Sequence, residues 1–245
     1  MPEAPQIRLI VKDLQPFVGQ KIIKATTQEK DFEPKRLEGE TIKEILVFGK
    51  QILIRLSDFT VRYHLLMFGK VKINESNEKG KLRLGLKFSK GEFSFYAGTI
   101  YYIDEPLDEV FDWTTDVMNP KWDATKALGK LAKHEDELIS DMLIDQDIFN
   151  GLGNKGVNEA LYRTKVHPAS TVGALPINKR KEIIKEAVDF SFDYLDWEEK
   201  GVAKNHFSVY LKKTCPVHGT PIKHEEIGKN GRKCHWCDEC QKVYA

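Results

Sequence analysis

The chain has 245 residues and a mass of 28.2 kDa, with 41% hydrophobic and 31% charged residues and a mean hydropathy of −0.44. No run approaches the roughly 18 apolar residues that a membrane helix needs, so the composition is typical of a soluble globular protein of one or two domains. The net charge is only +1, so any affinity for polyanions must come from an uneven distribution of charge.

Charge and cysteine content both change along the chain. Residues 104–149 hold 13 acidic and 4 basic residues, whereas residues 201–245 hold 8 Lys and Arg against 4 Asp and Glu. All four cysteines lie in that basic tail, which favours one local site in a reducing compartment over disulfides spread through a secreted fold. The first eight residues lack the basic stretch and apolar run of a secretory signal. We therefore expect a cytoplasmic protein without membrane segments.

The first half of the chain predicts one helix followed by many short strands. Apolar residues recur at helical spacing from about residue 4 to residue 18, and Gly19 follows them. Patterns typical of strands, separated by turn residues, occur at residues 21–27, 41–47, 52–56, 60–68, 70–74, 81–88 and 92–97. Many short strands between turns indicate a sandwich or barrel.

After Pro106 the pattern becomes helical. It predicts helices at residues 124–131, 135–148 and 178–200, and another that begins near Val157. Residues 151–154, Gly-Leu-Gly-Asn, interrupt the pattern and predict two helices joined by a tight glycine turn. The expected fold class is α+β: an N-terminal helix with an antiparallel β-sandwich, a helical domain and a C-terminal hairpin. The expected domains are residues 1–106, 107–205 and 206–245.

The tail carries a strong metal-binding pattern. Cys215 and His218 are separated by two residues, and Cys237 and Cys240 repeat this spacing after an interval of eighteen residues. Two such pairs supply the four tetrahedral N and S ligands that structural zinc prefers. We therefore expect one structural Zn²⁺ per chain. Cys234 and Cys237 form a competing pair with the same gap, which spacing does not exclude.

Two further features are suited to phosphate contact, although each also has a purely structural interpretation. Asn230-Gly231 is a favoured pair for a two-residue type I′ turn, which would project Arg232 from the zinc hairpin, and Arg can donate to two phosphate oxygens. The glycine turn before Asn154 presents backbone amides at a helix N-terminus. Taken singly, Arg232 is more often a solvated surface residue and Asn154 a turn residue.

The N-terminus offers a nucleophile. Once Met1 is removed, Pro2 becomes a secondary amine, of which on the order of a tenth is unprotonated near pH 7. Such an amine can form an imine, and Glu3 beside it can supply or accept the proton. Many proteins carry a small second residue for no reason beyond removal of the initiator Met, so this hypothesis depends on the rest of the pattern.

The order of these features resembles the bacterial DNA glycosylase family that contains formamidopyrimidine-DNA glycosylase and endonuclease VIII. The resemblance rests on Pro2-Glu3, Gly49-Lys50, residues 64–69, residues 151–154 and the zinc hairpin, and it covers essentially the whole chain. It implies a β-sandwich with its first helix, a helix-two-turn-helix domain and a zinc-finger β-hairpin. The implied activity is that of a bifunctional DNA glycosylase and abasic-site (AP) lyase. Its partner would be double-stranded DNA with an oxidised base or abasic site, bound by a monomer.

The resemblance implies four catalytic residues. Pro2 would be the Schiff-base nucleophile on C1′ of the damaged nucleotide, and Glu3 the acid that opens the sugar. Lys50 would contact phosphate and take part in β-elimination, and Arg232 would serve δ-elimination. Outside this resemblance, we would interpret Lys50 as a solvated hairpin residue.

The resemblance also implies a set of DNA contacts. Asn154 would grip phosphate, and His64 lies in the segment that the family uses at the DNA. Because the damaged base must be flipped out of the duplex, apolar residues must fill the void that it leaves. Leu66, Met67 and Phe68 occupy that position. Without the resemblance, His64 would be interpreted as a core histidine and the three apolar residues as a core strand.

Substrate preference follows from a missing motif. Oxidised-purine enzymes of the family carry an Asp-Pro-Arg-Arg-Phe-Gly stretch after the late strands, where residues 95–100 of this chain read Phe-Tyr-Ala-Gly-Thr-Ile. This difference and a short connection at residues 201–207 favour the endonuclease VIII side and oxidised pyrimidines. Gln6 and His218 also stand where the family often has Glu and Cys. Two alternatives stay open: a purine-lesion glycosylase, and a zinc-finger protein that recognises damaged DNA without cutting it.

Overall fold

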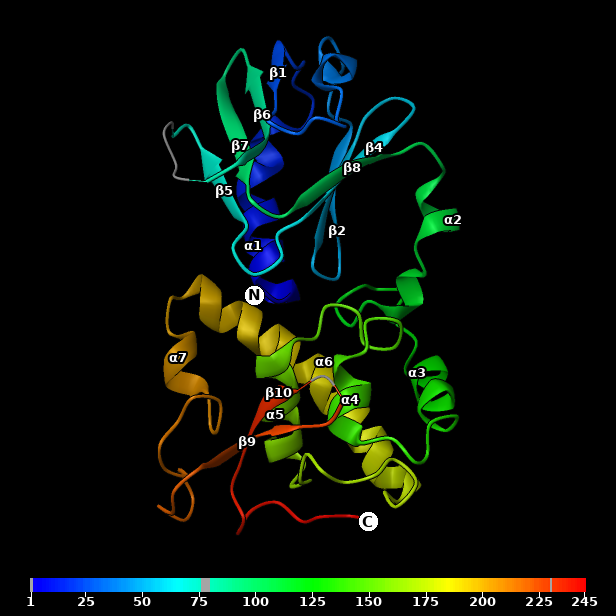
Figure 1. Ribbon diagram of the computed structural model, residues 1–245, viewed down its shortest axis with the longest axis vertical. Helices are drawn as coiled ribbons and strands as arrows, with labels where there is room; N and C mark the ends of the chain where they lie inside the picture. Colours follow the sequence, from blue (N-terminus) through cyan, green and yellow to red (C-terminus); the bar gives the residue numbers. More distant parts are fainter. Residues whose placement is uncertain (1, 76–79, 230) are drawn as a thin grey trace. The chain divides into compact units, whose positions relative to one another are not determined.

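The computed structural model describes residues 2–75, 80–229 and 231–245, and the chain folds as two units, Met1–Asp112 and Trp113–Ala245 (Figure 1). Within the described residues, no helix is long and apolar enough to cross a membrane. The division into three domains at residues 106 and 205 stays a prediction.

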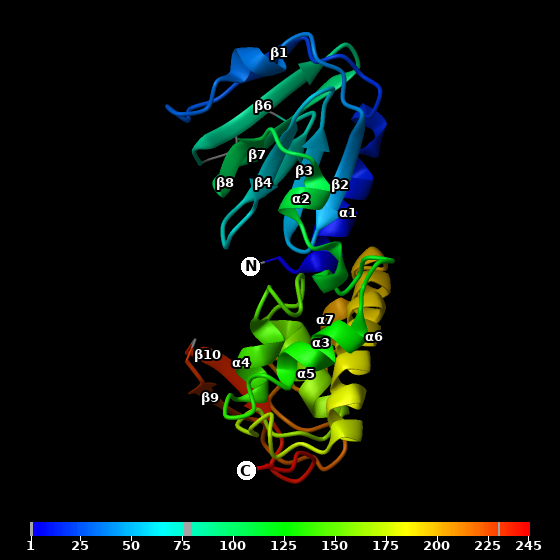
Figure 2. The same ribbon diagram turned by 90° about the vertical axis from the view of Figure 1, so that its right-hand side faces the viewer.

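The first unit is a sandwich of two antiparallel sheets that follows an N-terminal helix, as predicted (Figure 2). Its elements are α1 (Ala4–Leu14), the 3-10 helices η1 (Gln15–Phe17) and η2 (Pro34–Leu37), β1 (Lys24–Thr26), β2 (Glu44–Phe48), β3 (Gln51–Arg55), β4 (Thr60–His64), β5 (Lys70–Ile73), β6 (Leu82–Phe88), β7 (Gly91–Tyr96), β8 (Thr99–Ile103) and α2 (Leu107–Val110). One sheet has the strand order β1-β6-β7-β5 and the other β2-β3-β4-β8. Helix α1 lies against β2 and β3.

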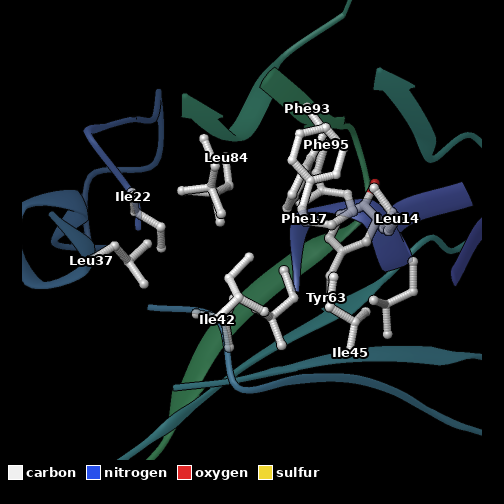
Figure 3. Packing of buried hydrophobic residues seen from close by; sticks show 14 of the residues in the cluster. Leu14, Phe17, Ile22, Leu37, Ile42, Ile45, Tyr63, Leu84, Phe93 and Phe95 are labelled. Atoms are coloured by element: carbon white, nitrogen blue, oxygen red, sulfur yellow. The ribbon is translucent and has the colours of Figure 1, made fainter. Parts of the chain in front are cut away.

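The core of this unit is formed by apolar side chains from the helix and from both sheets (Figure 3). The ring of Phe17 lies 5.0 Å from that of Phe93 and 4.9 Å from that of Phe88, which joins the end of the helical segment to β6 and β7. Full burial of one such side chain contributes about 1.5–3 kcal/mol. The apolar periodicity of residues 4–17 therefore reflects a helical segment that covers the sheets.

Strand β4 shows how the alternation of side chains separates the core from the partly exposed face of the sheet. Val61 and Tyr63 are fully buried, and the Tyr63 hydroxyl donates to the carbonyl of Tyr96 at 2.8 Å. Arg62 and His64 point to the opposite face, because successive residues of a strand alternate between its two sides. Both are partly exposed.

The predicted strand at residues 60–68 is wrong beyond His64. Residues 66–68 form a turn in which Leu66 has a φ of +55°, and the Gly69 amide donates to the Leu65 carbonyl at 2.8 Å. A Cβ at Gly69 would lie 2.2 Å from that carbonyl oxygen, so only glycine closes this turn. The apolar run is therefore presented on a loop and not buried in a strand.

The second unit is mainly helical and includes a two-stranded hairpin. Its elements are the 3-10 helix η3 (Trp113–Thr115), α3 (Ala124–Leu131), α4 (Ile139–Ile144), α5 (Asn154–Arg163), α6 (Ile177–Glu199), α7 (Ala203–His206), β9 (Lys223–Ile227) and β10 (Arg232–Trp236). Helix α5 is central, because it contacts α4, α6 and β10. The glycine turn at residues 151–153 leads into α5, as the sequence predicted.

The predicted helix at residues 135–148 is wrong in length, since α4 covers only Ile139–Ile144. Before it, backbone groups of residues 135–139 pair with residues 170–173, so they are not available for helical bonds. After it, the Asp145 carboxylate accepts the amide of Asp147 at 2.8 Å and begins a turn.

The connection between β9 and β10 also differs from the prediction. Arg232 pairs with Ile227, so the loop comprises residues 228–231 and is four residues long, not two. Asn230, the first residue of the predicted type I′ pair, lies outside the described residues. Gly228 and Gly231 both have positive φ angles, of 79° and 52°. Arg232 therefore stands at the base of the loop, as the first residue of β10.

Candidate active site and metal centre

Glu3 is buried at the start of α1, directly after the predicted nucleophile Pro2. It is 4% exposed and acts as the N-cap of the helix. Its carboxylate accepts the backbone N–H of Gln6, and its own N–H donates to the Gln6 side-chain oxygen at 3.3 Å. This reciprocal capping box satisfies two helix-terminal donors. Gln6 therefore holds the Pro2-Glu3 backbone in place, a role that needs no ionisable group.

Lys50 lies in the two-residue turn between β2 and β3 and is 5% exposed, so its interpretation as a solvated hairpin residue is wrong. Its neighbour Gln51 pairs with His64 across β3 and β4. The pKa of His64 is lowered, first by burial and then by the positive charges of Arg62 and Lys50. The strand register therefore gathers Lys50, His64 and Arg62, and it favours the neutral form of His64.

Arg62 is a candidate that the sequence analysis missed. Its guanidinium carbon lies 4.8 Å from the ring centroid of Tyr101 and 5.5 Å from that of Phe111, and burial lowers its pKa. Stacking on aromatic faces orients an Arg while leaving N–H groups for an anion. The alternation along β4 was the available signal, since it places Arg62 on the same face as His64.

The turn at residues 66–68 exposes three consecutive apolar side chains. Leu66, Met67 and Phe68 are 42%, 65% and 78% exposed. Their interpretation as a core strand is therefore wrong. Consecutive exposed apolar residues on a loop are typical of a surface that contacts a partner.

The four predicted zinc ligands converge. The ligand atoms of Cys215, His218, Cys237 and Cys240 all lie within 4.8 Å of one another. Cys240 Sγ is 3.6 Å from Cys215 Sγ and 3.3 Å from His218 Nδ1, and a tetrahedral zinc site with the usual bond lengths needs separations of about 3.5–3.8 Å. The residues therefore fit a tetrahedral zinc ion.

The surroundings of Cys215 favour its thiolate form. Burial would raise the pKa of the Cys215 thiol, but hydrogen bonds from Tyr162 and from the backbone of His218 and Val217 lower it to about 6. The Tyr162 hydroxyl lies 3.5 Å from Cys215 Sγ. Thiolates are the form that binds zinc.

Cys234 does not belong to the cluster. It is 2% exposed on β10, and its pKa is raised to about 11, first by burial and then by the negative charge of Asp141. Its sulfur is not among the four ligand atoms that lie within 4.8 Å of one another. The competing Cys234–Cys237 pair is therefore not the one that the fold assembles.

The hairpin is fastened to the helices by side chains that bind its backbone. Asp141 of α4 accepts the Lys229 amide at 3.0 Å, and Asn154 Nδ2 donates to the Lys233 carbonyl at 2.9 Å. A Cβ at Gly228 would lie 2.3 Å from the Asp141 carboxylate, so the loop approaches α4 closely. These bonds place Asn154 beside Lys233, the residue that follows Arg232.

Glu159 of α5 is a second residue that the sequence analysis missed. It is fully buried, and its carboxylate accepts the amides of Ser208, Val209 and Tyr210 at 2.8–2.9 Å. Three charge-assisted bonds of this kind compensate for burying the charge. An acidic residue within the apolar run of Val157 and Ala160 was the available signal. It fixes the loop that leads to the metal cluster.

The candidate residues therefore fall into two groups. Pro2, Glu3, Lys50 and His64 belong to the first unit with the exposed turn at residues 66–68, and Asn154, Arg232 and the metal cluster belong to the second. A sandwich unit with a buried acid near its N-terminus and a helical unit whose basic hairpin adjoins a Cys and His cluster are features suited to a protein that acts on nucleic acid.

Comparison with known proteins identifies the family. Residues 1–99 match the formamidopyrimidine-DNA glycosylase N-terminal domain. The chain is 30% identical to a formamidopyrimidine-DNA glycosylase of Lactobacillus helveticus over the full length of both, and 25% identical to endonuclease 8-like 2 of Mus musculus over 98% of this chain and 96% of the mouse protein. The crystal structure of Lactococcus lactis formamidopyrimidine-DNA glycosylase, non-covalently bound to DNA containing an AP site, superimposes with a TM-score of 0.86 at 25% identity and covers 98% of this chain and 99% of that one.

The chain belongs to the formamidopyrimidine-DNA glycosylase and endonuclease VIII family of DNA-repair enzymes. The predicted enzyme class, a DNA glycosylase with AP lyase activity, and the predicted DNA partner are confirmed at the level of this family. The monomeric state and the cytoplasmic location stay predictions.

Proposed function

We propose that this chain removes oxidised bases from DNA, with pyrimidines preferred, through a Schiff base formed by Pro2 and followed by β- and δ-elimination. The observation that supports this most directly is the N-terminus of α1, where a buried carboxylate, Glu3, is held in a capping box immediately after Pro2. Trapping of the imine with borohydride, and its dependence on a free Pro2, tests the proposal.

The proposed reaction begins with attack on C1′. The Pro2 nitrogen bonds to C1′, the bond from C1′ to the base breaks, and the base leaves with a proton. Glu3 donates a proton to the ring oxygen as the sugar opens, which gives an iminium ion. Loss of a C2′ proton then expels the 3′ phosphate, and a second elimination expels the 5′ phosphate. Lys50 and Arg232 supply positive charge to these leaving phosphates.

Access to C1′ requires that the damaged nucleotide leave the duplex. The turn at residues 66–68 presents Leu66, Met67 and Phe68 to solvent on the same unit as Pro2 and Glu3. Apolar side chains inserted between base steps compensate for lost stacking. We assign the void-filling role to this turn, and phosphate binding to His64 and Asn154.

The metal of this protein is proposed to be a single structural Zn²⁺ held by Cys215, His218, Cys237 and Cys240. When bound, it closes the tail around four ligands and leaves no position for substrate. The side chains of Asp141 in α4 and Asn154 in α5 hold the hairpin to these two helices. Those contacts orient Arg232.

Pyrimidine preference is supported by the connection between β7 and β8. It consists of Ala97 and Gly98 alone, which have positive φ angles of 53° and 69°. A Cβ at Gly98 would lie 2.4 Å from the His64 carbonyl oxygen, so the turn packs tightly on β4. A two-residue turn has no room for the additional Arg and Phe of the purine-lesion enzymes.

We therefore expect duplexes with thymine glycol or 5-hydroxyuracil to be cleaved faster than duplexes with 8-oxoguanine opposite cytosine, by roughly tenfold or more. Single-turnover rates on the three substrates, compared with cleavage of a plain abasic site, measure this directly. Equal rates on pyrimidine and purine lesions would contradict the proposed preference and would assign the chain to the purine-lesion glycosylases.

Replacement of Asp141, whose carboxylate binds the hairpin loop, should affect δ-elimination selectively. In Asp141→Ala the Lys229 amide loses a charged acceptor, and Arg232 loses its fixed position, so the ratio of δ to β product is expected to fall on the order of tenfold. Asp141→Asn retains an acceptor oxygen and should keep most of the ratio. Zinc content and borohydride trapping serve as controls. An unchanged product ratio in Asp141→Ala would show that Arg232 does not depend on this anchor.

A further inference from the structure

Leu211 has two properties that the stability of the fold does not explain. Its φ is +57°, in the left-handed region, and the residue is 70% exposed. A left-handed backbone is unfavourable for leucine compared with glycine, and an exposed apolar side chain gains little from burial. Backbone strain of this kind is concentrated at functional and ligand-binding sites, so Leu211 is a candidate for a contact outside the chain.

The backbone around Leu211 is held firmly. The three residues before it, Ser208, Val209 and Tyr210, donate their amides to the buried carboxylate of Glu159. After it, the Lys212 amide donates to the Val209 carbonyl at 3.1 Å. The exposed leucine is therefore presented by an anchored loop.

The surroundings of Leu211 indicate the partner. Residues 201–213 contain three lysines and no acidic residue. The ring of Tyr210 lies 5.2 Å from that of His235 on β10, the strand that begins with Arg232. Glu159, which anchors the loop, is in the same helix as Asn154. The loop that carries Leu211 therefore contacts the same helix and strand that carry Asn154 and Arg232, the residues to which we assign phosphate binding. The loop also lies in a basic segment, which suits a polyanion.

We propose that Leu211 is an apolar contact to DNA, packing against the sugars and base edges of the strand whose phosphates Asn154 and Arg232 bind. Apolar side chains in otherwise basic surfaces contact DNA in this way. The inference rests on the proposed function, because it adds a contact to the same substrate complex. It concerns binding, and it assigns Leu211 no part in the chemical steps.

The test compares Leu211→Gly with Leu211→Met in the full-length protein. Both are assayed for affinity to a duplex that contains a tetrahydrofuran abasic analogue, which cannot form a Schiff base. Leu211→Gly should bind about tenfold more weakly, with the slope of log affinity against log salt unchanged, since no phosphate contact is lost. Its Tm should not fall, because glycine accepts the positive φ. Leu211→Met, which remains apolar, should bind within about twofold of the wild type.

A matched control is Lys165→Gly. Lys165 is exposed, has a φ of +59° and belongs to the same unit, so this variant relieves a similar backbone conformation without removing an apolar side chain. Its affinity should match that of the wild type. Unchanged affinity in Leu211→Gly would overturn the inference, as would a fall in Tm beyond that of Lys165→Gly. Borohydride trapping of the wild type on a true abasic site is measured separately, so that failure of the proposed function is recognised independently.

Discussion

A protein whose Pro2 amine is blocked is expected to bind abasic DNA but to form no borohydride-reducible adduct. An imine requires a free amine, and the side chain of Glu3, the buried residue beside Pro2, carries none. The wild type should form a permanent link to an abasic duplex, with the adduct on the N-terminal peptide that lacks Met1. Loss of a covalent nucleophile should lower the single-turnover rate by roughly a thousandfold or more.

The sharpest form of this experiment retains Met1 or extends it with a tag. Pro2→Gly is less decisive, because its N-terminal primary amine can still form an imine. The blocked protein keeps Lys50, Asn154 and Arg232, so its affinity for DNA and the salt dependence of that affinity should be nearly unchanged. If blocked and processed proteins crosslink equally well, a lysine is the nucleophile. If neither crosslinks, the chain recognises damage without cutting.

Loss of one zinc ligand is expected to have the second large effect. Cys240→Ser should abolish stoichiometric zinc binding and weaken DNA binding, because the proposed zinc ion would bridge the two ligand pairs that flank the hairpin. Structural zinc contributes about 10–16 kcal/mol in small zinc-finger peptides, so the tail should lose its order without it. Metal analysis, together with a thermal melt in the presence and absence of a chelator, measures both consequences.

The matched control is Cys234→Ser, which replaces another cysteine of the same hairpin. Cys234 is buried on β10 and is no member of the ligand cluster, so this variant should keep one zinc per chain. A small loss of stability, of about 1 kcal/mol, is expected from placing a more polar hydroxyl in this buried position. Loss of zinc from Cys234→Ser, with retention in Cys240→Ser, would overturn the assigned ligand set.

Features that depend on neighbouring residues were readable from the sequence. The two-residue gaps between Cys215 and His218 and between Cys237 and Cys240 predict the metal cluster, because a tight turn alone brings the members of each pair together. The glycine turn before Asn154 and the helical periodicity from residue 4 are local in the same sense. The resemblance to the family also depends on short motifs, and comparison with relatives confirms it.

The tertiary structure decided what depends on contacts between distant residues. Periodicity assigned residues 66–68 to a strand, but the close approach of Gly69 to the Leu65 carbonyl turns the chain and exposes them. Spacing left Cys234 as a possible ligand, but the fold brings together the ligand atoms of Cys215, His218, Cys237 and Cys240 without it.

Burial is the common reason for these differences. Lys50 could be placed in a hairpin turn from its sequence, but only the assembled sheet shows that it is buried beside His64 and Arg62. The roles of Glu159 and Leu211 depend on the fold, since Glu159 binds three amides some fifty residues away and Leu211 is distinguished by a backbone angle. Hydrogen bonds and burial of this kind are set by the whole fold, whereas the residues that we propose for the chemistry belong to short motifs that the sequence itself displays.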